Sequence, residues 1–127
     1  RNLSVQKTPL IWTKLMKIKV RDREDVTILD ISGDITIGKG DVELRKEISE
    51  LIHNEKKKVL LNLRKVDFID SSGIGEIVRS LTTIQKNDGT LKLLHLEAKV
   101  RDLFTITRLI TVFETFENEK EAIDSFK

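Results

Sequence analysis

Two kinds of apolar pattern alternate along the chain. Short runs of β-branched and other apolar residues predict strands, whereas apolar residues that recur every three or four positions predict amphipathic helices. From Met16 onward these segments follow one another in the order ββαβαβαβα. Such alternation is typical of a sheet whose parallel strands are joined by helical crossovers. We therefore expect an α/β fold with one mixed sheet.

Five strands are expected. The segments KIKVR (17–21) and VTILDIS (26–32) are separated by the polar turn DRED, which predicts an antiparallel hairpin at the start of the sheet. The run VLLNL (59–63) is apolar almost throughout, as in a central strand buried on both faces. The remaining strands are expected at 91–96 and 111–116.

Helical spacing predicts the four crossover and terminal helices. They run from Val42 to near His53, from Ile74 to the turn NDG at 87–89, over 99–109 and over 119–127. The right-handed crossover rule places the consecutive parallel connections mainly on one face of the sheet. Gly89 is suited to a left-handed cap of the second helix.

Composition narrows the class of protein. A chain of 127 residues, 39% hydrophobic and 35% charged, describes one soluble globular domain. No apolar run approaches the roughly eighteen residues of a membrane span, so no membrane association is expected. Cysteine is absent, which fits a cytoplasmic location, and His53 and His95 stand apart without the spacing of a metal motif. Neither a metal nor a cofactor is expected.

The net charge of +2 is no sign of a nucleic-acid partner. Arg1, Lys7 and Lys14 lie in the first fifteen residues without any acidic residue, so the remainder of the chain carries slightly more acidic than basic groups. The chain begins with arginine, and its only methionine is Met16. We therefore interpret residues 1–15 as an added or disordered extension upstream of the natural start, and residues 16–127 as the domain.

Residues 33–39, GDITIGK, nearly match a phosphate-binding loop between a strand and a helix. A nucleotide-hydrolysing loop needs Ser or Thr at the next position to ligate magnesium, and Gly40 stands there. Ile35 and Ile37 are also bulky where backbone amides would wrap an anion. A glycine-rich connection explains the same residues. Nucleotide hydrolysis stays a third possibility, which loss of activity in Lys39→Ala would identify.

The stretch VDFIDSSGIGEIV (66–78) leads from a strand into a helix through two adjacent serines. Neither Ser71 nor Ser72 follows a glycine by two positions, as a nucleophile elbow requires. We therefore predict no catalytic residue and no enzyme activity.

Helix capping explains part of this stretch, because Asp and Ser are favoured at a helix N-terminus and glycines permit a tight turn. Each glycine inside a helix nevertheless costs roughly 1 kcal/mol relative to alanine. Gly73 and Gly75 therefore indicate that glycine is kept in this first turn for a reason other than capping. One such reason is close approach by the backbone of another molecule, and a second is exposure of the serine hydroxyls to a modifying enzyme.

The motif FIDSSGIG, together with the DG turn before a strand and the pattern V-x-x-L-F-x-I-T-x-L at 100–109, carries a family resemblance. The chain resembles the anti-sigma factor antagonists, which consist of a single STAS domain. The resemblance extends over residues 16–127, whose order of elements agrees with that fold.

The resemblance implies a regulatory switch. In that family the serine directly after the aspartate, here Ser71, is phosphorylated by an anti-sigma factor that is a serine kinase of the histidine-kinase-like ATPase fold. The unphosphorylated antagonist binds this kinase and frees a sigma factor for transcription. The phosphorylated antagonist cannot bind until a metal-dependent serine phosphatase removes the phosphoryl group. The implied partner surface comprises Asp70, Ser72, Gly73 and Gly75, with Asp34 and Thr36 in the neighbouring loop.

The chain departs from the family at Thr36, where many members have an acidic residue. An alternative function therefore stays open. The domain would act as a scaffold, independent of phosphorylation, or as a subunit of a transporter or stress-signalling complex, and the serines would serve only as helix caps.

Overall fold

The computed structural model describes residues 15–127. The predicted extension over 1–15 therefore lies, except for Leu15, outside the described residues.

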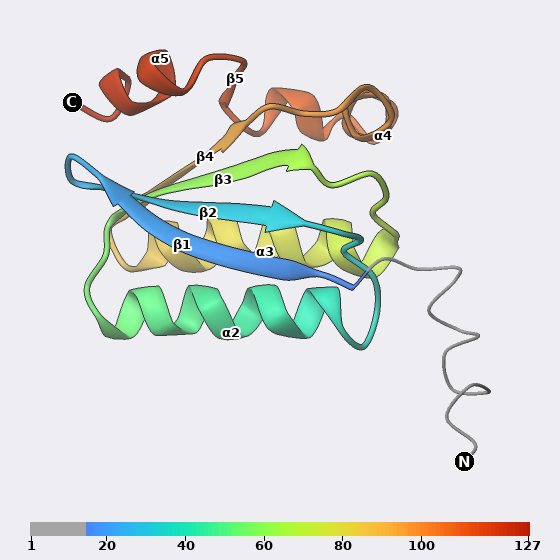
Figure 1. Ribbon diagram of the computed structural model, residues 1–127, viewed down its shortest axis with the longest axis horizontal. Coiled ribbons are helices and arrows are strands. Elements are labelled where there is room, and N and C mark those ends of the chain that lie inside the picture. The colour runs from blue at the N-terminus through green and yellow to red at the C-terminus, as the bar shows by residue number, and fades with distance from the viewer. Residues whose placement is uncertain (1–14) are drawn as a thin grey trace.

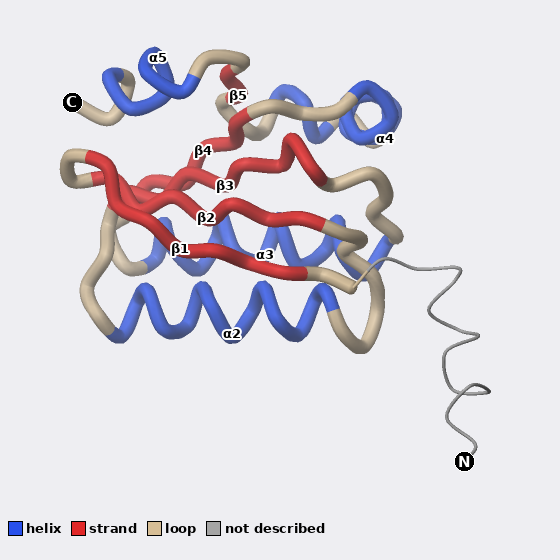
Figure 2. The backbone as a smooth tube through the Cα atoms, viewed as in Figure 1, coloured by secondary structure: helices blue, strands red, loops and turns tan. Residues whose placement is uncertain are grey.

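The described chain forms one five-stranded sheet in the order β1-β2-β3-β4-β5 (Figures 1 and 2). The strands β1 and β2 form the antiparallel hairpin predicted from the sequence, and the pairs from β2 to β5 are parallel. Their bounds are Lys17–Arg23 for β1, Val26–Ser32 for β2, Lys58–Lys65 for β3, Thr90–Leu94 for β4 and Thr115–Phe116 for β5.

Helices cover the two faces unequally. Figure 1 shows α2 (Gly40–His53) and α3 (Ser71–Lys86) side by side along one face, and α5 (Glu119–Asp124) over the other. Val100 and Phe104 of α4 (Ala98–Ile106) join the same core as α2 and α3. The crossover helices thus contribute mainly to one face, as predicted.

The apolar runs explain this arrangement. Residues of β2, β3 and β4 that point toward α2 and α3 form the larger core, and the alternate residues Val26, Ile28, Leu60 and Leu94 pack against Ala122 and Ile123 of α5. Central strands buried on both faces need apolar side chains at successive positions, so VLLNL lacks the alternation of a half-exposed strand.

The last predicted strand is mostly wrong. Residues 109–111 form a 3-10 helix, and only Thr115 and Phe116 pair with β4. Phe113 is buried against Phe104, with ring centroids 5.7 Å apart, so its side chain packs in the core before the chain becomes extended.

The predicted helix over 99–109 ends earlier, at Ile106, because Arg108 adopts a left-handed conformation with φ of 65°.

The end of α3 also differs from expectation. The left-handed residue in the NDG turn is Asp88, with φ of 63°, rather than Gly89. Gly89 is needed for space, because a Cβ there would lie 2.8 Å from both the Ile84 side chain and the Lys57 carbonyl oxygen.

Candidate functional site

Two loops lie side by side at the edge of the sheet where β2 and β3 end. The amide of Gly33 donates to the Lys65 carbonyl at 3.1 Å, and that of Ile35 donates to the Phe68 carbonyl at 3.1 Å. The Asp70 amide donates back to the Ile35 carbonyl at 3.2 Å. These bonds continue the parallel pairing of β2 and β3 past the strand ends and bring the loop after β2 to the start of α3.

Asp70 is the N-cap of α3. Its Oδ1 accepts from the Gly73 amide at 2.8 Å, and its Oδ2 accepts from the Ile37 amide at 2.9 Å. The first bond satisfies an amide that would otherwise lack a partner at the helix start. The second attaches the neighbouring loop to the same carboxylate. Asp70 thus positions the predicted site, and its side chain is half-buried.

The structure distinguishes the two serines. Ser71, the first residue of α3, is exposed, whereas Ser72 is half-buried. Neither hydroxyl forms a hydrogen bond with another described residue. An incoming molecule therefore reaches Ser71 more readily than Ser72.

The two glycines of the motif have different surroundings. A Cβ on Gly73 would lie 2.1 Å from the Ile35 carbonyl oxygen, so only glycine lets α3 start so close to the neighbouring loop. A Cβ on Gly75 would meet no heavy atom within 4 Å, and this residue is exposed. The fold itself requires glycine at position 73 but not at position 75.

The two residues predicted in the neighbouring loop lie at different depths. Asp34 is 9% exposed, whereas Thr36 is half-buried and its carbonyl accepts from the Asp41 amide at 3.1 Å. Thr36 is thus closer to the surface than Asp34. Partner binding by either residue stays a prediction.

Two exposed apolar residues that the motif does not predict as part of the site lie close to Asp70. Ile37 is 72% exposed, and Phe68 is 55% exposed. The hydrogen bonds from Ile37 to Asp70 and from Ile35 to Phe68 place both backbones at this site. Large apolar residues in short loops were the available signal, but their exposure depends on the register of the two loops.

The loop that nearly matches a phosphate-binding loop uses its amides internally. The amides of Gly33, Ile35 and Ile37 donate to the partners given above, and the Gly38 amide donates to Asp41 Oδ1 at 2.8 Å. A Cβ on Gly40 would lie 2.7 Å from the Asp34 carbonyl oxygen. Ser or Thr would therefore not fit where a nucleotide-hydrolysing loop needs its hydroxyl.

A buried carboxylate joins the helix that starts at Ser71 to its neighbour. Glu76 in α3 is 3% exposed, and its Oε1 accepts from Nε and lies 2.9 Å from Nη2 of Arg45 in α2. Arg79 Nε lies 3.9 Å from Glu76 Oε2. Because an unpaired buried carboxylate is costly, Arg45 favours a fixed position of α3 against α2.

Within residues 15–127, His, Asp and Glu form no cluster of three or more that could hold a metal ion. No helix in this part of the chain combines the length and apolar character needed to cross a bilayer.

The chain is similar to proteins of a known domain family. The STAS domain family matches residues 17–122. An anti-sigma-B factor antagonist of Bacillus subtilis is 27% identical over 99 residues, which cover 78% of this chain and 89% of that protein. Its name describes a regulator and not an enzyme.

Two solved structures share the fold. The Bacillus cell fate determinant SpoIIAA in its phosphorylated form has a TM-score of 0.68 at 20% identity, covering 87% of this chain and all of that one. A sulfate transporter family protein from Wolinella succinogenes has a TM-score of 0.71 at 18% identity, covering 83% of this chain and 87% of that one.

Proposed function

Because the chain belongs to the STAS domain family, with anti-sigma factor antagonists among its relatives, we propose that it is a cytoplasmic anti-sigma factor antagonist controlled by phosphorylation of Ser71. One observation carries this proposal. Ser71 is exposed at the first position of α3, directly after Asp70, whose carboxylate accepts from the amide of exposed Ile37, and three residues after exposed Phe68.

The docking surface comprises Ile37, Phe68, Ser71 and Gly75, all exposed. Apolar side chains on a surface contribute to binding when a partner removes them from water. Gly75 leaves room for a partner backbone, because no heavy atom lies within 4 Å of the position that a Cβ would take. Asp70, Gly73, Thr36 and Asp34 support this surface from beneath or at its margin, and Ser72 lies next to it.

Phosphorylation would change the charge of this surface rather than the fold. A phosphoryl group adds about −1.5 to −2 charges at pH 7. At a helix N-terminus the helix dipole favours that charge in the free domain. In a complex, the same group would have to lose water beside the Asp70 carboxylate and the apolar contacts, which opposes docking.

The proposed partner is an anti-sigma factor that is also a serine kinase of the histidine-kinase-like ATPase fold. The unphosphorylated protein would bind it and release a sigma factor, and a serine phosphatase would regenerate the binding form. The protein itself contributes a surface and a hydroxyl acceptor, and no catalytic group.

A binding measurement with three variants tests the proposal. Ser71→Asp places a carboxylate at the proposed phosphorylation site, Ser72→Asp places it one residue further, and Ser49→Asp places it on an exposed position of α2. By calorimetry with the anti-sigma factor encoded nearest to this gene, Ser71→Asp should weaken binding by about tenfold or more. Ser49→Asp should bind like the wild type. Wild-type affinity of Ser71→Asp would contradict the proposal.

A constitutive STAS subunit is the second candidate. The likeness to the Wolinella protein shows that the same fold occurs in a sulfate transporter family protein. The capping of α3 by Asp70 and the tight packing of Gly73 also explain much of the motif without any modification. This candidate predicts a stable complex with affinity independent of ATP and of substitutions at Ser71.

A further inference from the structure

A cavity of about 640 Å³ lies on the face of the sheet that α5 covers only in part. It begins where the apolar contacts of α5 end and extends to the edge where β2 and β3 end. The strand register places Lys17, Ser32 and Lys65 in one row across β1, β2 and β3, and Lys19, Asp30 and Asn62 in the next. All six line the cavity.

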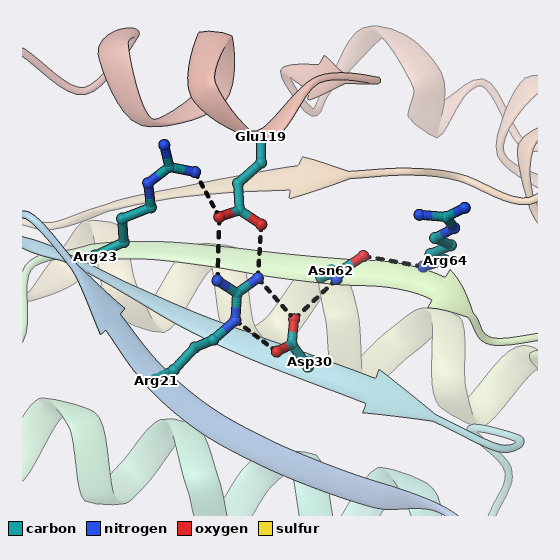
Figure 3. Close-up of polar contacts among 6 residues, drawn as sticks. All are labelled: Arg21, Arg23, Asp30, Asn62, Arg64 and Glu119. Atoms are coloured by element: carbon teal, nitrogen blue, oxygen red, sulfur yellow. Dashed lines mark hydrogen bonds and ion pairs between the residues drawn. The ribbon is translucent and has the colours of Figure 1, made fainter.

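The floor of the cavity is held by a network centred on Arg21. Figure 3 shows this guanidinium between Asp30 and Glu119. Its Nε and Nη2 donate to Asp30 at 2.6 and 3.2 Å, and its Nη1 and Nη2 donate to Glu119 at 3.0 and 2.6 Å. The hydrogen bonds that Arg21 donates to Glu119, and then those to Asp30, raise the pKa of Arg21 above its ordinary value. The carboxylates of the cavity are thus neutralised within the network.

Asn62 extends the network toward the open part of the cavity. Its Nδ2 donates to Asp30 Oδ1 at 2.8 Å, and its Oδ1 accepts from the Arg64 amide at 3.2 Å, as Figure 3 shows. Both ends of the amide are therefore fixed. A floor whose polar groups are already paired needs little rearrangement when a ligand binds, which favours affinity.

The rim carries an excess of positive charge. Arg23 also donates to Glu119, at 2.8 Å, so Arg21 and Arg23 balance Asp30 and Glu119. The side chains of Lys17, Lys19, Arg64 and Lys65 form no ion pair with another residue in the described part of the chain. These four cations surround a floor that is neutral overall.

We propose that this cavity binds a small soluble molecule that carries a polyphosphate group or several phosphate groups. Its volume lies within the roughly 300–1,000 Å³ of ordinary small-molecule sites. Lysine ammonium groups and a guanidinium are the usual protein donors to phosphate oxygens, and four of them suit a ligand with several negative charges. The floor supplies Ser32 and Asn62 as further polar contacts for the part of the ligand that carries the phosphates.

This site is distinct from the docking surface around Ser71, although both lie at the same end of the sheet. Lys65 belongs to the cavity, and its carbonyl accepts from the Gly33 amide in the loop that Asp70 holds. The proposal does not depend on phosphorylation of Ser71 or on any anti-sigma factor.

Titration of the isotope-labelled protein with pyrophosphate, followed by amide NMR shifts, tests the site. The amides of Ser32, Asn62, Lys65 and His95 should shift together. The variant Lys17→Ala/Lys65→Ala should weaken binding by about tenfold or more, since each charge-assisted hydrogen bond contributes about 1.5–3 kcal/mol. The control Lys46→Ala, an exposed cation of α2 outside the cavity, should leave it unchanged.

Three results would overturn the proposal. One is shifts confined to Ser71–Gly73, which would mean binding at the start of α3 alone. Another is equal binding by the double variant and by Lys46→Ala, which would mean attraction to the surface in general. The third is no binding of pyrophosphate while the protein still associates with phosphatidylglycerol vesicles, which would mean a membrane surface as the ligand.

Discussion

The carboxylate of Asp70 accepts a hydrogen bond from the amide of Ile37, a residue 33 positions earlier in the chain, at 2.9 Å. The same carboxylate caps α3 through the Gly73 amide. One side chain therefore holds both loops that present the surface around Ser71, so loss of Asp70 changes stability and site geometry together.

Asp70→Ala should lower the free energy of unfolding by about 1–3 kcal/mol, because it removes the helix cap and the bond to the neighbouring loop. Asp70→Asn should cost less, since asparagine also caps helices but offers one acceptor oxygen instead of two. Urea unfolding of the two variants checks the order. If Asp70→Ala is as stable as the wild type, the carboxylate does not hold the loops in solution.

Gly73→Ala and Gly75→Ala should have opposite effects on stability. The first variant places a Cβ 2.1 Å from the Ile35 carbonyl oxygen and should cost about 1–3 kcal/mol. The second meets no neighbour and should stabilise α3 by up to about 1 kcal/mol, because alanine favours helices. Thermal unfolding measures both changes.

Gly75→Ala also tests the docking surface without loss of folding. If a partner backbone approaches this position, the variant should bind the anti-sigma factor more weakly than the wild type while melting at the same or a higher temperature. Unchanged affinity would show that the partner does not use the space at position 75.

The sequence predicted the elements whose side chains point in regular directions. The run VLLNL and the spacing of Ile74, Ile77, Leu81 and Ile84 follow directly from burial on a sheet and along one helix face. The strand expected at 111–116 was mostly wrong because Phe113 is apolar for a different reason, namely its contact with Phe104. Hydrophobicity alone does not distinguish a strand residue from one that packs beneath a turn.

The motif predicted a site around Ser71, but a motif does not indicate contacts between residues that are distant in sequence. Arg21 and Glu119 are separated by 98 positions, and a charged residue on a strand or helix does not indicate its partner. In the same way, the exposure of Ile37 depends on its bond to Asp70 in a different loop. The distinction between exposed Ser71 and half-buried Ser72 also required the start of α3 to be placed.

The Arg21 network predicts a loss of stability in acid. A hydrogen bond from Arg21 lowers the pKa of Glu119 from 4.5 to about 2. The folded state therefore keeps this carboxylate ionised where the unfolded chain already binds a proton. The stabilising contribution of the ionised Glu119 carboxylate is therefore complete above pH 4.5 and decreases as the pH falls toward 2.

Glu119→Gln should lower stability at pH 7 by about 1 kcal/mol, as expected for a partly exposed network of charges. The difference from the wild type should shrink as the pH falls from 4.5 toward 2. Chemical denaturation at pH 7, 4 and 3 measures it. A difference that grows in acid would contradict the assigned pairing.

Lys92 should anchor the C-terminal helix. This lysine is 5% exposed, its Nζ donates to Ser125 O and Oγ at 3.0 and 2.9 Å, and the ammonium lies 4.8 Å from the Phe126 ring centroid. Lys92→Met keeps most of the volume but removes the donors. It should increase hydrogen exchange of α5 amides and lower stability by about 1–3 kcal/mol.

Lys120→Met provides the matched control for Lys92, because Lys120 lies in α5 but its side chain is 74% exposed. It should leave the exchange of α5 almost unchanged. Equal exchange in the two variants would mean that Lys92 does not anchor this helix.

Intact mass after incubation with ATP and the nearest encoded kinase-like anti-sigma factor tests the central claim most directly. We predict one added phosphoryl group in the wild type and in Ser72→Ala, none in Ser71→Ala, and release of the modified protein from the complex. No added mass in the wild type, with a complex equally stable with and without ATP, would contradict a switch at Ser71.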